Sequence, residues 1–431
     1  MCGFRGGVRV VALASWMVAA IWAGASGAEW PQFRGPQRDG RCSETGLLKE
    51  WPEGGPKLVW KLEGLGRGYS NVAIVGGKLY TMGDIKPHGG GAEAQFVLAF
   101  DLASRDEVWA TRIGPAHSDG GPRSTPTVDG ELLYVVGTEG DLVCLESATG
   151  KIRWQKSFAK DFGGRMMSMW KFSESPLVDG EKLVCTPGGK EATLVALDKK
   201  TGETIWKCAV PALGKRGKDG AGYASMIAAD VDGSRQYIQI LGRGAVGVDA
   251  QTGKFLWGYN GIANTVANIP TPVAKGNLVF VTTSYETGSA LLKISRDGDE
   301  VKAEEVYFLK YRDFENHHGG IVLVGDHLYG GSGRNSGIPV CVEFATGKIA
   351  WKDKPVGKRS AAVLYADGNL YFRYEDGAMA LVEATPEEFR LKGKFMPPVV
   401  DGPAWPYPVI HDGKLYLRAH NVLMCYDVRQ Q

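Results

Sequence analysis

A tryptophan recurs about every 50 residues through the first half of the chain, and this period constrains the fold more than any other feature. Trp60, Trp109, Trp154, Trp206 and Trp257 are separated by 49, 45, 52 and 51 residues. A period of this length is typical of repeat architectures with about four short strands in each unit. Each repeat in such a chain buries its apolar face against its neighbours.

The tryptophan closes a motif that reads small-x-acid-x-x-x-Gly-x-x-x-Trp. Complete copies end at Trp154, Trp206, Trp257 and Trp351. A weaker copy runs from Ala99 to Trp109 and lacks the glycine. We expect the glycine to give a left-handed turn and the acid to accept hydrogen bonds from turn N–H groups. The indole should fill the contact between neighbouring repeats, with its N–H free to reach a backbone carbonyl.

A second pattern, an apolar strand, a polar-Gly turn and another apolar strand, occurs eight times. The turns are centred on Gly76-Gly77, Asp129-Gly130, Asp179-Gly180, Asp232-Gly233, Lys275-Gly276, Gly325-Asp326, Asp367-Gly368 and Asp412-Gly413. Asp-Gly between alternating apolar residues predicts a hairpin, because the tight turn needs positive φ. The chain has 60 glycines in 431 residues, about twice the usual share, which agrees with many tight turns.

The last repeat is split between the two ends of the chain. It begins at Cys425 and Asp427, and its tryptophan strand is found at residues 56–60. We therefore predict an all-β fold: an eight-bladed β-propeller of four-stranded antiparallel blades, closed by pairing the N-terminal strand with the C-terminal blade. The predicted units are a signal peptide (1–28), a segment that packs on the propeller (29–56) and the propeller itself (57–431).

Residues 1–28 have the layout of a secretory signal peptide. Arg5 and Arg9 precede an apolar run that ends in Ser26-Gly27-Ala28, with small residues where cleavage occurs. An uncleaved anchor is the alternative. We expect an exported mature chain, periplasmic or secreted, without a transmembrane segment. Lys plus Arg total 50 and Asp plus Glu 48; such a balance excludes a basic nucleic-acid binder.

The tryptophan-anchored repeat resembles that of the pyrroloquinoline quinone (PQQ)-like β-propellers. This family includes the quinoprotein alcohol dehydrogenases and outer-membrane assembly lipoproteins of the BamB type. The segments Trp30-Pro31-Gln32-Phe33-Arg34-Gly35-Pro36 and Asn316-His317-His318-Gly319-Gly320 are more similar to secreted, mostly uncharacterised members. The resemblance implies the fold; it does not by itself imply an activity.

Short motifs of well-known enzyme classes do not identify an activity for this chain. Residues 242–247 match a dinucleotide fingerprint, but a strand follows the glycines where a helix is required. Six cysteines follow residue 28; we expect Cys144, Cys341 and Cys425 to fill equivalent core positions, and a Cys185–Cys208 bridge is possible. The dehydrogenases typically carry two adjacent cysteines beside the cofactor, and this chain has no Cys-Cys pair.

The residues just before each first strand should surround the mouth of the central channel, because the first strand of a blade is innermost. They are Arg67, Tyr69, Arg123, Trp170, Glu174, Tyr223, Asn268, His317, His318, Arg359, Trp405 and Tyr407. Arginines suit carboxylates and aromatic rings suit a flat ligand, so such a ring could hold PQQ. In the dehydrogenases a Glu and an Asn help to hold Ca²⁺ and an Asp acts as base; Glu174 and Asn268 have suitable chemistry, but no Asp is a clear base.

Three further interpretations of this mouth stay open. It can be an ordinary polar channel mouth, a site for an organic ligand, or a metal site at His317 and His318. Adjacent residues of a strand point to opposite faces, so the two histidines are poor joint ligands unless the chain bends there.

The first functional hypothesis is an exported scaffold that binds a ligand or a protein partner of unknown identity in the envelope. The second is a quinoprotein oxidoreductase acting on an alcohol or sugar, with PQQ and Ca²⁺ in the channel. The third is an outer-membrane assembly factor. It is disfavoured because Cys2 precedes the apolar run and is not placed as a lipid anchor.

Overall fold

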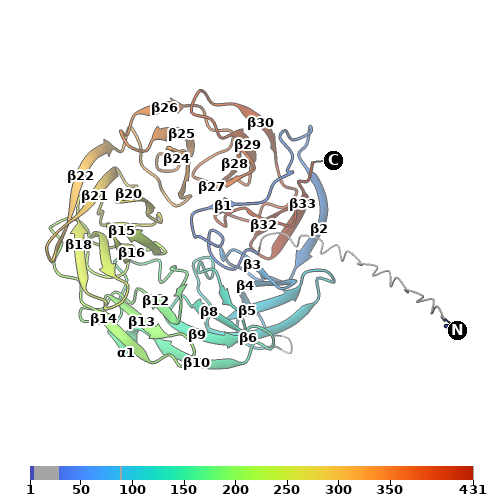
Figure 1. Cartoon of the computed structure of the whole chain (residues 1–431), viewed down its shortest axis with the longest axis horizontal. Helices are drawn as coiled ribbons and strands as arrows, with labels where there is room; N and C mark the ends of the chain where they lie inside the picture. The colour runs from blue at the N-terminus through green and yellow to red at the C-terminus, as the bar shows by residue number, and fades with distance from the viewer. Residues whose placement is uncertain (4–28, 88–89, 431) are drawn as a thin grey trace.

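Eight four-stranded blades are arranged around a central axis (Figure 1), as the repeats predict, and the sheet of one blade gains a fifth strand from the N-terminal segment. The structure is a computed structural model that describes residues 1–3, 29–87 and 90–430. In each blade the first strand is innermost, and successive strands pair antiparallel toward the rim. The predicted signal peptide lies almost entirely outside the described residues. No helix within the described part of the chain is long and apolar enough to span a bilayer.

The first four blades follow one another in the sequence. Blade 1 comprises β3 (Ala73–Val75), β4 (Lys78–Ile85), β5 (Ala94–Asp101) and β6 (Glu107–Pro115). Blade 2 comprises β7 (Thr127–Asp129), β8 (Leu132–Val136), β9 (Asp141–Glu146) and β10 (Ile152–Ser157), followed by the short helix α1 (Phe158–Phe162). Blade 3 comprises β11 (Leu177–Asp179), β12 (Lys182–Cys185), β13 (Leu194–Asp198) and β14 (Thr204–Cys208). Blade 4 comprises β15 (Ile227–Val231), β16 (Ser234–Leu241), β17 (Gly244–Asp249) and β18 (Phe255–Tyr259).

The second four blades complete the circle. Blade 5 comprises β19 (Val273–Lys275), β20 (Leu278–Thr283), β21 (Gly288–Asp297) and β22 (Glu300–Lys310). Blade 6 comprises β23 (Ile321–Val324), β24 (His327–Ser332), β25 (Ile338–Glu343) and β26 (Ile349–Lys352). Blade 7 comprises β27 (Ala361–Ala366), β28 (Asn369–Tyr374), β29 (Met379–Glu383) and β30 (Leu391–Phe395). Blade 8 comprises β31 (Val409–His411), β32 (Lys414–Ala419), β33 (Val422–Asp427) and β2 (Lys57–Glu63).

The closing blade confirms the predicted pairing of the two chain ends. β2 pairs antiparallel with β33, and Trp60 lies opposite Cys425. The small residue of the motif occupies the same register in the five other blades that carry the tryptophan, for example Gly247 opposite Trp257. A Cβ atom on Gly247 would lie 2.0 Å from the indole nitrogen of Trp257. The motif therefore begins with a small residue because the indole of the next strand lies over it.

The motif glycine has a related role between blades. Gly150 has φ +71°, and a Cβ there would lie 2.5 Å from ring atoms of Trp109 in the preceding blade. The Trp109 indole N–H donates to the carbonyl of Ser147, 3.1 Å away. The acid accepts hydrogen bonds from the turn, as Asp198 does from the N–H groups of Lys200 and Thr201. The motif glycine thus packs on the tryptophan of the preceding blade, while the acid closes the turn within its own blade.

Gly150→Ala is expected to destabilise the fold by about 2 kcal/mol more than Gly180→Ala, because only the first substitution also overpacks an interface. Gly180 has φ +60°, but a Cβ there meets no atom within 4 Å. The two substitutions share the backbone strain and differ in the contact with Trp109. Urea unfolding of the wild type and both variants measures the difference, and equal losses would contradict the packing role.

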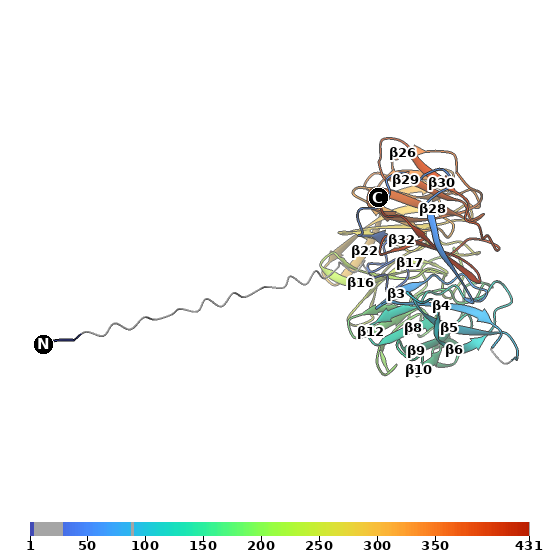
Figure 2. The same ribbon diagram turned by 90° about the vertical axis from the view of Figure 1, so that its right-hand side faces the viewer.

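The N-terminal segment runs through the middle of the ring (Figure 1), where β1 (Arg41–Cys42) pairs parallel with β27. Trp30 pairs with Ile74 of blade 1, and the Arg38 guanidinium donates to the carbonyls of Ser175 and Pro176 at blade 3. We call residues 30–42 the channel segment. Figure 2 shows the ring of blades from its side. The channel segment therefore contacts at least three blades.

Candidate functional site

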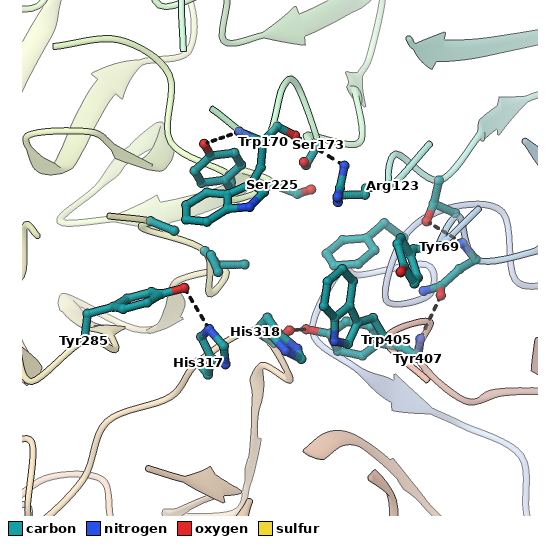
Figure 3. Close-up of a pocket in the computed structure, with 16 residues that line it drawn as sticks. Tyr69, Arg123, Trp170, Ser173, Ser225, Tyr285, His317, His318, Trp405 and Tyr407 are labelled. Atoms are coloured by element: carbon teal, nitrogen blue, oxygen red, sulfur yellow. Dashed lines mark hydrogen bonds between the residues drawn. The ribbon is translucent and has the colours of Figure 1, made fainter. Parts of the chain in front are cut away.

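A cavity of about 300 Å³ lies on the axis, lined mainly by the loops that precede the innermost strands (Figure 3). Its aromatic lining consists of Phe33, Tyr69, Trp170, Tyr223, Tyr285, Trp405 and Tyr407. Its polar lining consists of Asn71, Arg123, Thr125, Ser173, Ser225, His317 and His318. Phe33 comes from the channel segment and contacts Tyr407 with a ring-centroid distance of 5.3 Å. The cavity therefore has a wall contributed by the segment that occupies the channel.

Hydrogen bonds between neighbouring blades fix the base of these loops. The Tyr407 N–H donates to Asn71 Oδ1 (2.7 Å), and the Asn71 N–H donates to Thr125 Oγ1 (3.3 Å). The Thr125 N–H donates to Ser175 Oγ and the Ser175 N–H to Ser225 Oγ, both at 2.9 Å. Equivalent positions of successive blades are thus linked through short polar side chains. This arrangement holds the loops, and the rings that they carry, in fixed positions.

Of the predicted mouth residues, eight line the cavity together. They are Tyr69, Arg123, Trp170, Tyr223, His317, His318, Trp405 and Tyr407. Tyr69 lies against Trp405 at 4.3 Å between ring centroids, and the Arg123 guanidinium lies over both rings at 5.6 and 5.9 Å. Trp170 contacts Tyr223 at 5.9 Å. The topology therefore brings together side chains that are far apart in the sequence; whether they hold a cofactor stays a prediction.

Arg67 and Arg359 lie outside the cavity lining. Arg67 reaches Glu93 Oε2 at 3.3 Å and the His117 carbonyl at 3.1 Å. Arg359 donates to Glu375 Oε1 at 3.1 Å, and its side chain is 66% exposed. Each guanidinium therefore bonds to a nearby carboxylate, Glu93 for Arg67 and Glu375 for Arg359, and neither arginine lines the cavity.

Glu174 and Asn268 are buried inside the blades instead of facing the cavity. Glu174 accepts from the Thr186 N–H and hydroxyl and from Gln239 Nε2. Burial raises the pKa of Glu174 to about 7, although the bonds from Thr186 oppose the shift. The Asn268 amide donates to the carbonyls of Leu241 and Gly242. Both side chains satisfy neighbouring polar groups.

His317 and His318 face the same cavity because the chain between them is not a strand. Their rings are 4.4 Å apart between centroids, and Gly320, with φ +68°, follows before β23 begins. His317 Nδ1 bonds to the Ser360 hydroxyl at 2.8 Å and its Nε2 to the Tyr285 hydroxyl at 3.0 Å. Both ring nitrogens of His317 are therefore occupied. Among the described residues, no group of three or more His, Cys, Asp or Glu could hold a metal ion.

Glu375 lies behind His318, with an ion-pair distance of 3.6 Å from Oε2 to His318 Nε2. Burial would raise the pKa of Glu375. The neighbouring His318 and the hydrogen-bonded Arg359 outweigh burial and lower this pKa to about 2. Glu375 is therefore an anion at neutral pH that is held next to the wall by a paired cation.

Eight of the sixteen lining residues were not among the predicted mouth residues, and two of these eight, Phe33 and Tyr285, lie outside the loops that precede the first strands. Phe33 belongs to the channel segment, whose path could not be placed from the repeats. Tyr285 lies in the loop between β20 and β21, between the second and third strands of blade 5. Its φ of +62° and that of Glu286, +63°, are unusual for residues with a side chain. Such strained backbone is a clue that only coordinates provide.

Stability is expected to fall as the pH falls from about 6.5 to 3, with a contribution from His317. Burial and then His318 lower the pKa of His317 to about 3, whereas an unfolded histidine has a pKa of about 6.5. The unfolded chain therefore binds a proton in this window that the folded chain does not, and acid favours unfolding. Thermal unfolding at pH 7 and 4.5 should show a smaller loss for His317→Gln than for the wild type.

His327→Gln, at the start of β24, is the matched control and should retain the wild-type slope. The buried Glu174 has the opposite effect, because its raised pKa makes stability fall as the pH rises from about 4.5 to 7. Its contribution is present in every variant and cancels from the comparison. Parallel pH profiles of wild type and His317→Gln would contradict the prediction.

The cavity does not fit PQQ with Ca²⁺. PQQ is a flat tricarboxylate, and Arg123 is the single lysine or arginine among the described residues that line the cavity. The same lining contains no Asp or Glu, although Ca²⁺ prefers carboxylate oxygens. Cys185 and Cys208 are free thiols in the structure, as are the other cysteines. Of the features that PQQ requires, the cavity supplies only the aromatic faces.

The blades, their closure and the axial cavity define a PQQ-like β-propeller. A family model described as outer membrane protein assembly factor BamB matches residues 93–353. This is more than half of the chain, and the protein belongs to that family. None of the curated proteins matches the sequence.

Solved structures with the same fold are distant in sequence. BamB from Moraxella catarrhalis is 13% identical with a TM-score of 0.61, over 86% of this chain and 99% of that chain. Quinohemoprotein alcohol dehydrogenase from Comamonas testosteroni is 12% identical with a TM-score of 0.62, over 94% and 81%. The corresponding enzyme ADHIIG from Pseudomonas putida HK5 is 14% identical with a TM-score of 0.63, over 94% and 81%. These likenesses support the fold alone.

Proposed function

We propose that this chain is an exported propeller that binds a small organic ligand in the axial cavity. The observation that carries the proposal is the aromatic lining, in which rings from several blades and the channel segment converge on about 300 Å³. Concave, mostly apolar cavities with a few fixed polar groups are the usual form of ligand sites. Positive φ values at Lys171, Tyr285 and Arg359, next to or within the lining, agree with a functional role.

A screen of small ring compounds tests this proposal. Binding is measured by the fluorescence of the purified protein and by the shift in its thermal unfolding. Trp170→Ala should weaken binding of a hit at least about tenfold, because it removes a stacking face. Met169→Ala, which changes the exposed neighbouring residue, should leave the affinity unchanged. A screen without a hit, or a hit indifferent to Trp170→Ala, would contradict the proposal.

Export is part of the proposal and is supported by the layout of residues 1–28. Cell fractionation should place the protein in the periplasm or the medium, and sequencing of its N-terminus should begin at Glu29. A cytoplasmic protein with an intact N-terminus would contradict it.

A second candidate is a protein-interaction scaffold in outer-membrane assembly, favoured by the match to the BamB family model. Deleting the gene should then lower the amounts of β-barrel proteins in the outer membrane. Restoring the wild type should recover these amounts, and so should Trp170→Ala, because this function does not require the cavity. Unchanged barrel content after deletion would exclude the candidate.

A further inference from the structure

The polar groups of the cavity are mostly donors. Thr125 Oγ1 accepts the Asn71 N–H and Ser225 Oγ accepts the Ser175 N–H, so each hydroxyl retains its own proton for another partner. Both residues are buried. The amide oxygen of Asn71 is already occupied by the Tyr407 N–H. The two hydroxyls therefore each offer a ligand a hydrogen-bond donor.

Three of the four tyrosines that line the cavity have hydroxyls bonded within the protein; the fourth is Tyr69. Tyr407 donates to the His318 carbonyl at 2.8 Å, and the Tyr223 hydroxyl bonds to Ser168 Oγ at 2.7 Å. Tyr285 is bonded to His317. Their rings face the cavity while their hydroxyls have partners in the protein. They supply apolar surface more than polar contacts.

Arg123 provides the charge, and its position is fixed. Its Nη1 donates to the Trp170 carbonyl at 3.3 Å and its Nη2 to the Asp119 carbonyl at 2.9 Å. The side chain is 14% exposed, and its acidic neighbour Asp119, 3.4 Å away, is 66% exposed. Burial lowers the pKa of Arg123, and Asp119 partly opposes the shift. The cation is thus partly desolvated and is paired with a carboxylate that water screens.

The carboxylates near the wall already have partners, and the Arg334 guanidinium, which lies over the Tyr285 ring at 4.7 Å, is not part of the lining. Glu375, behind His318, is bonded to Arg359. Glu315 is buried and accepts the N–H groups of Glu286 and Arg334. Neither carboxylate lines the cavity. Arg123 consequently sets the sign of the charge that a ligand meets.

We infer that the cavity takes a small ligand made of one ring and one carboxylate, with the carboxylate at Arg123 and the ring among the aromatic side chains. This inference rests on the proposed function and specifies its ligand. Figure 3 shows Arg123 on one side of the opening and Tyr285 with His317 across from it. A carboxylate at Arg123 gains charge-assisted hydrogen bonds, while the ring lies against Trp170 or Trp405.

Aromatic acids and sugar acids both match this description, and a panel of probes separates them. The probes are 4-hydroxybenzoate, 4-hydroxybenzamide, benzyltrimethylammonium, galacturonate and galactose. Calorimetric titration of the wild type should show a carboxylate at least about tenfold tighter than its neutral counterpart. The pair that shows this preference, aromatic or sugar, identifies the source. The ammonium probe should bind more weakly than the amide.

Arg123→Gln should remove the preference, so that acid and neutral counterpart bind equally. The affinity of this variant for the neutral probe should stay within about twofold of wild type, which shows that the cavity is intact. Arg153→Gln, which changes an arginine paired with Glu146 at 2.9 Å on β10, is the control and should retain the wild-type preference.

Two failures are distinguishable. If neutral or cationic rings bind as tightly as the acids, the carboxylate assignment is wrong while the proposed ligand site stands. If no ring compound binds, the proposed function is wrong and the inference falls with it. Retention of the acid preference by Arg123→Gln would overturn the role of this arginine.

Discussion

Replacing Arg418 by methionine is expected to lower the free energy of unfolding by about 4 kcal/mol, among the largest effects of any single substitution. Arg418, on β32, is 2% exposed. Its guanidinium donates to the carbonyls of Ser70 (2.9 Å) and Met82 (2.7 Å) in blade 1 and to Leu65 (3.1 Å) in the connection from β2. It also donates to Gly66, His420 and the Thr81 hydroxyl.

The substitution leaves these buried acceptors without a partner, and each costs about 1–3 kcal/mol when unsatisfied. Burial lowers the pKa of Arg418 to about 9, so the group is still a cation at neutral pH. Methionine fills much of the volume but donates no hydrogen bond. Blades 8 and 1 would lose the buried polar contacts made by Arg418, while the bond from the Tyr407 N–H to Asn71 Oδ1 remains.

Urea unfolding followed by tryptophan fluorescence measures the effect. Arg390→Met is the matched control: Arg390 is 36% exposed and pairs with glutamates at the surface, where ion pairs contribute about 0–1 kcal/mol. A loss for Arg418→Met no larger than that for the control would show that the buried arginine is dispensable for closure.

The second large effect is expected from Arg38→Met, about 3 kcal/mol, because Arg38 ties the channel segment to two blades. Its guanidinium donates to the carbonyls of Ser175 (2.8 Å), Pro176 (3.0 Å) and Met226 (2.9 Å). Burial lowers its pKa to about 10, with Glu174 opposing the shift. Loss of the cation would leave three buried carbonyls unsatisfied and a buried carboxyl without its neighbour.

Arg41→Met tests the same segment at an exposed position. Arg41 lies over the Tyr365 ring at 5.3 Å, a contact worth about 0.5–1 kcal/mol. Thermal and urea unfolding of both variants give the comparison. Ligand affinity is a second measurement, since Phe33 lines the cavity and should be displaced only in Arg38→Met. Equal stability of the two variants would contradict the anchoring role of Arg38.

The fold was predictable because its determinants are local and repeated. The spacing of tryptophans gives the blade, and the small residue opposite Trp257 or Trp60 has a steric cause that is visible in the motif. The split repeat gave the closure for the same reason. Export of the chain and the domain boundaries at residues 28 and 56 stay predictions.

The site was predictable only where topology decides it. A propeller places the loops before its first strands at one mouth, so Trp170 and Tyr223 could be grouped. Side-chain direction within such a loop depends on neighbouring polar groups. Glu174 turns inward to Thr186, whereas Arg123 stays at the cavity. Phe33 was missed because a segment without repeat pattern reveals its path only through tertiary contacts.

The pairing of β2 with β33 also sets the order in which the polypeptide matures. Trp60 cannot pair with Cys425, its partner across the sheet, until the ribosome has added more than 350 further residues. Blades 1 to 7 can form from contacts between residues that are near in the sequence. The pairing of β2 with β33 depends on contacts between residues that are far apart in the sequence, and such contacts form slowly. Until then β2 presents an unsatisfied edge to other nascent copies. We therefore expect the slowest refolding phase to accelerate in a circular permutant that places residues 57–63 directly after residue 427.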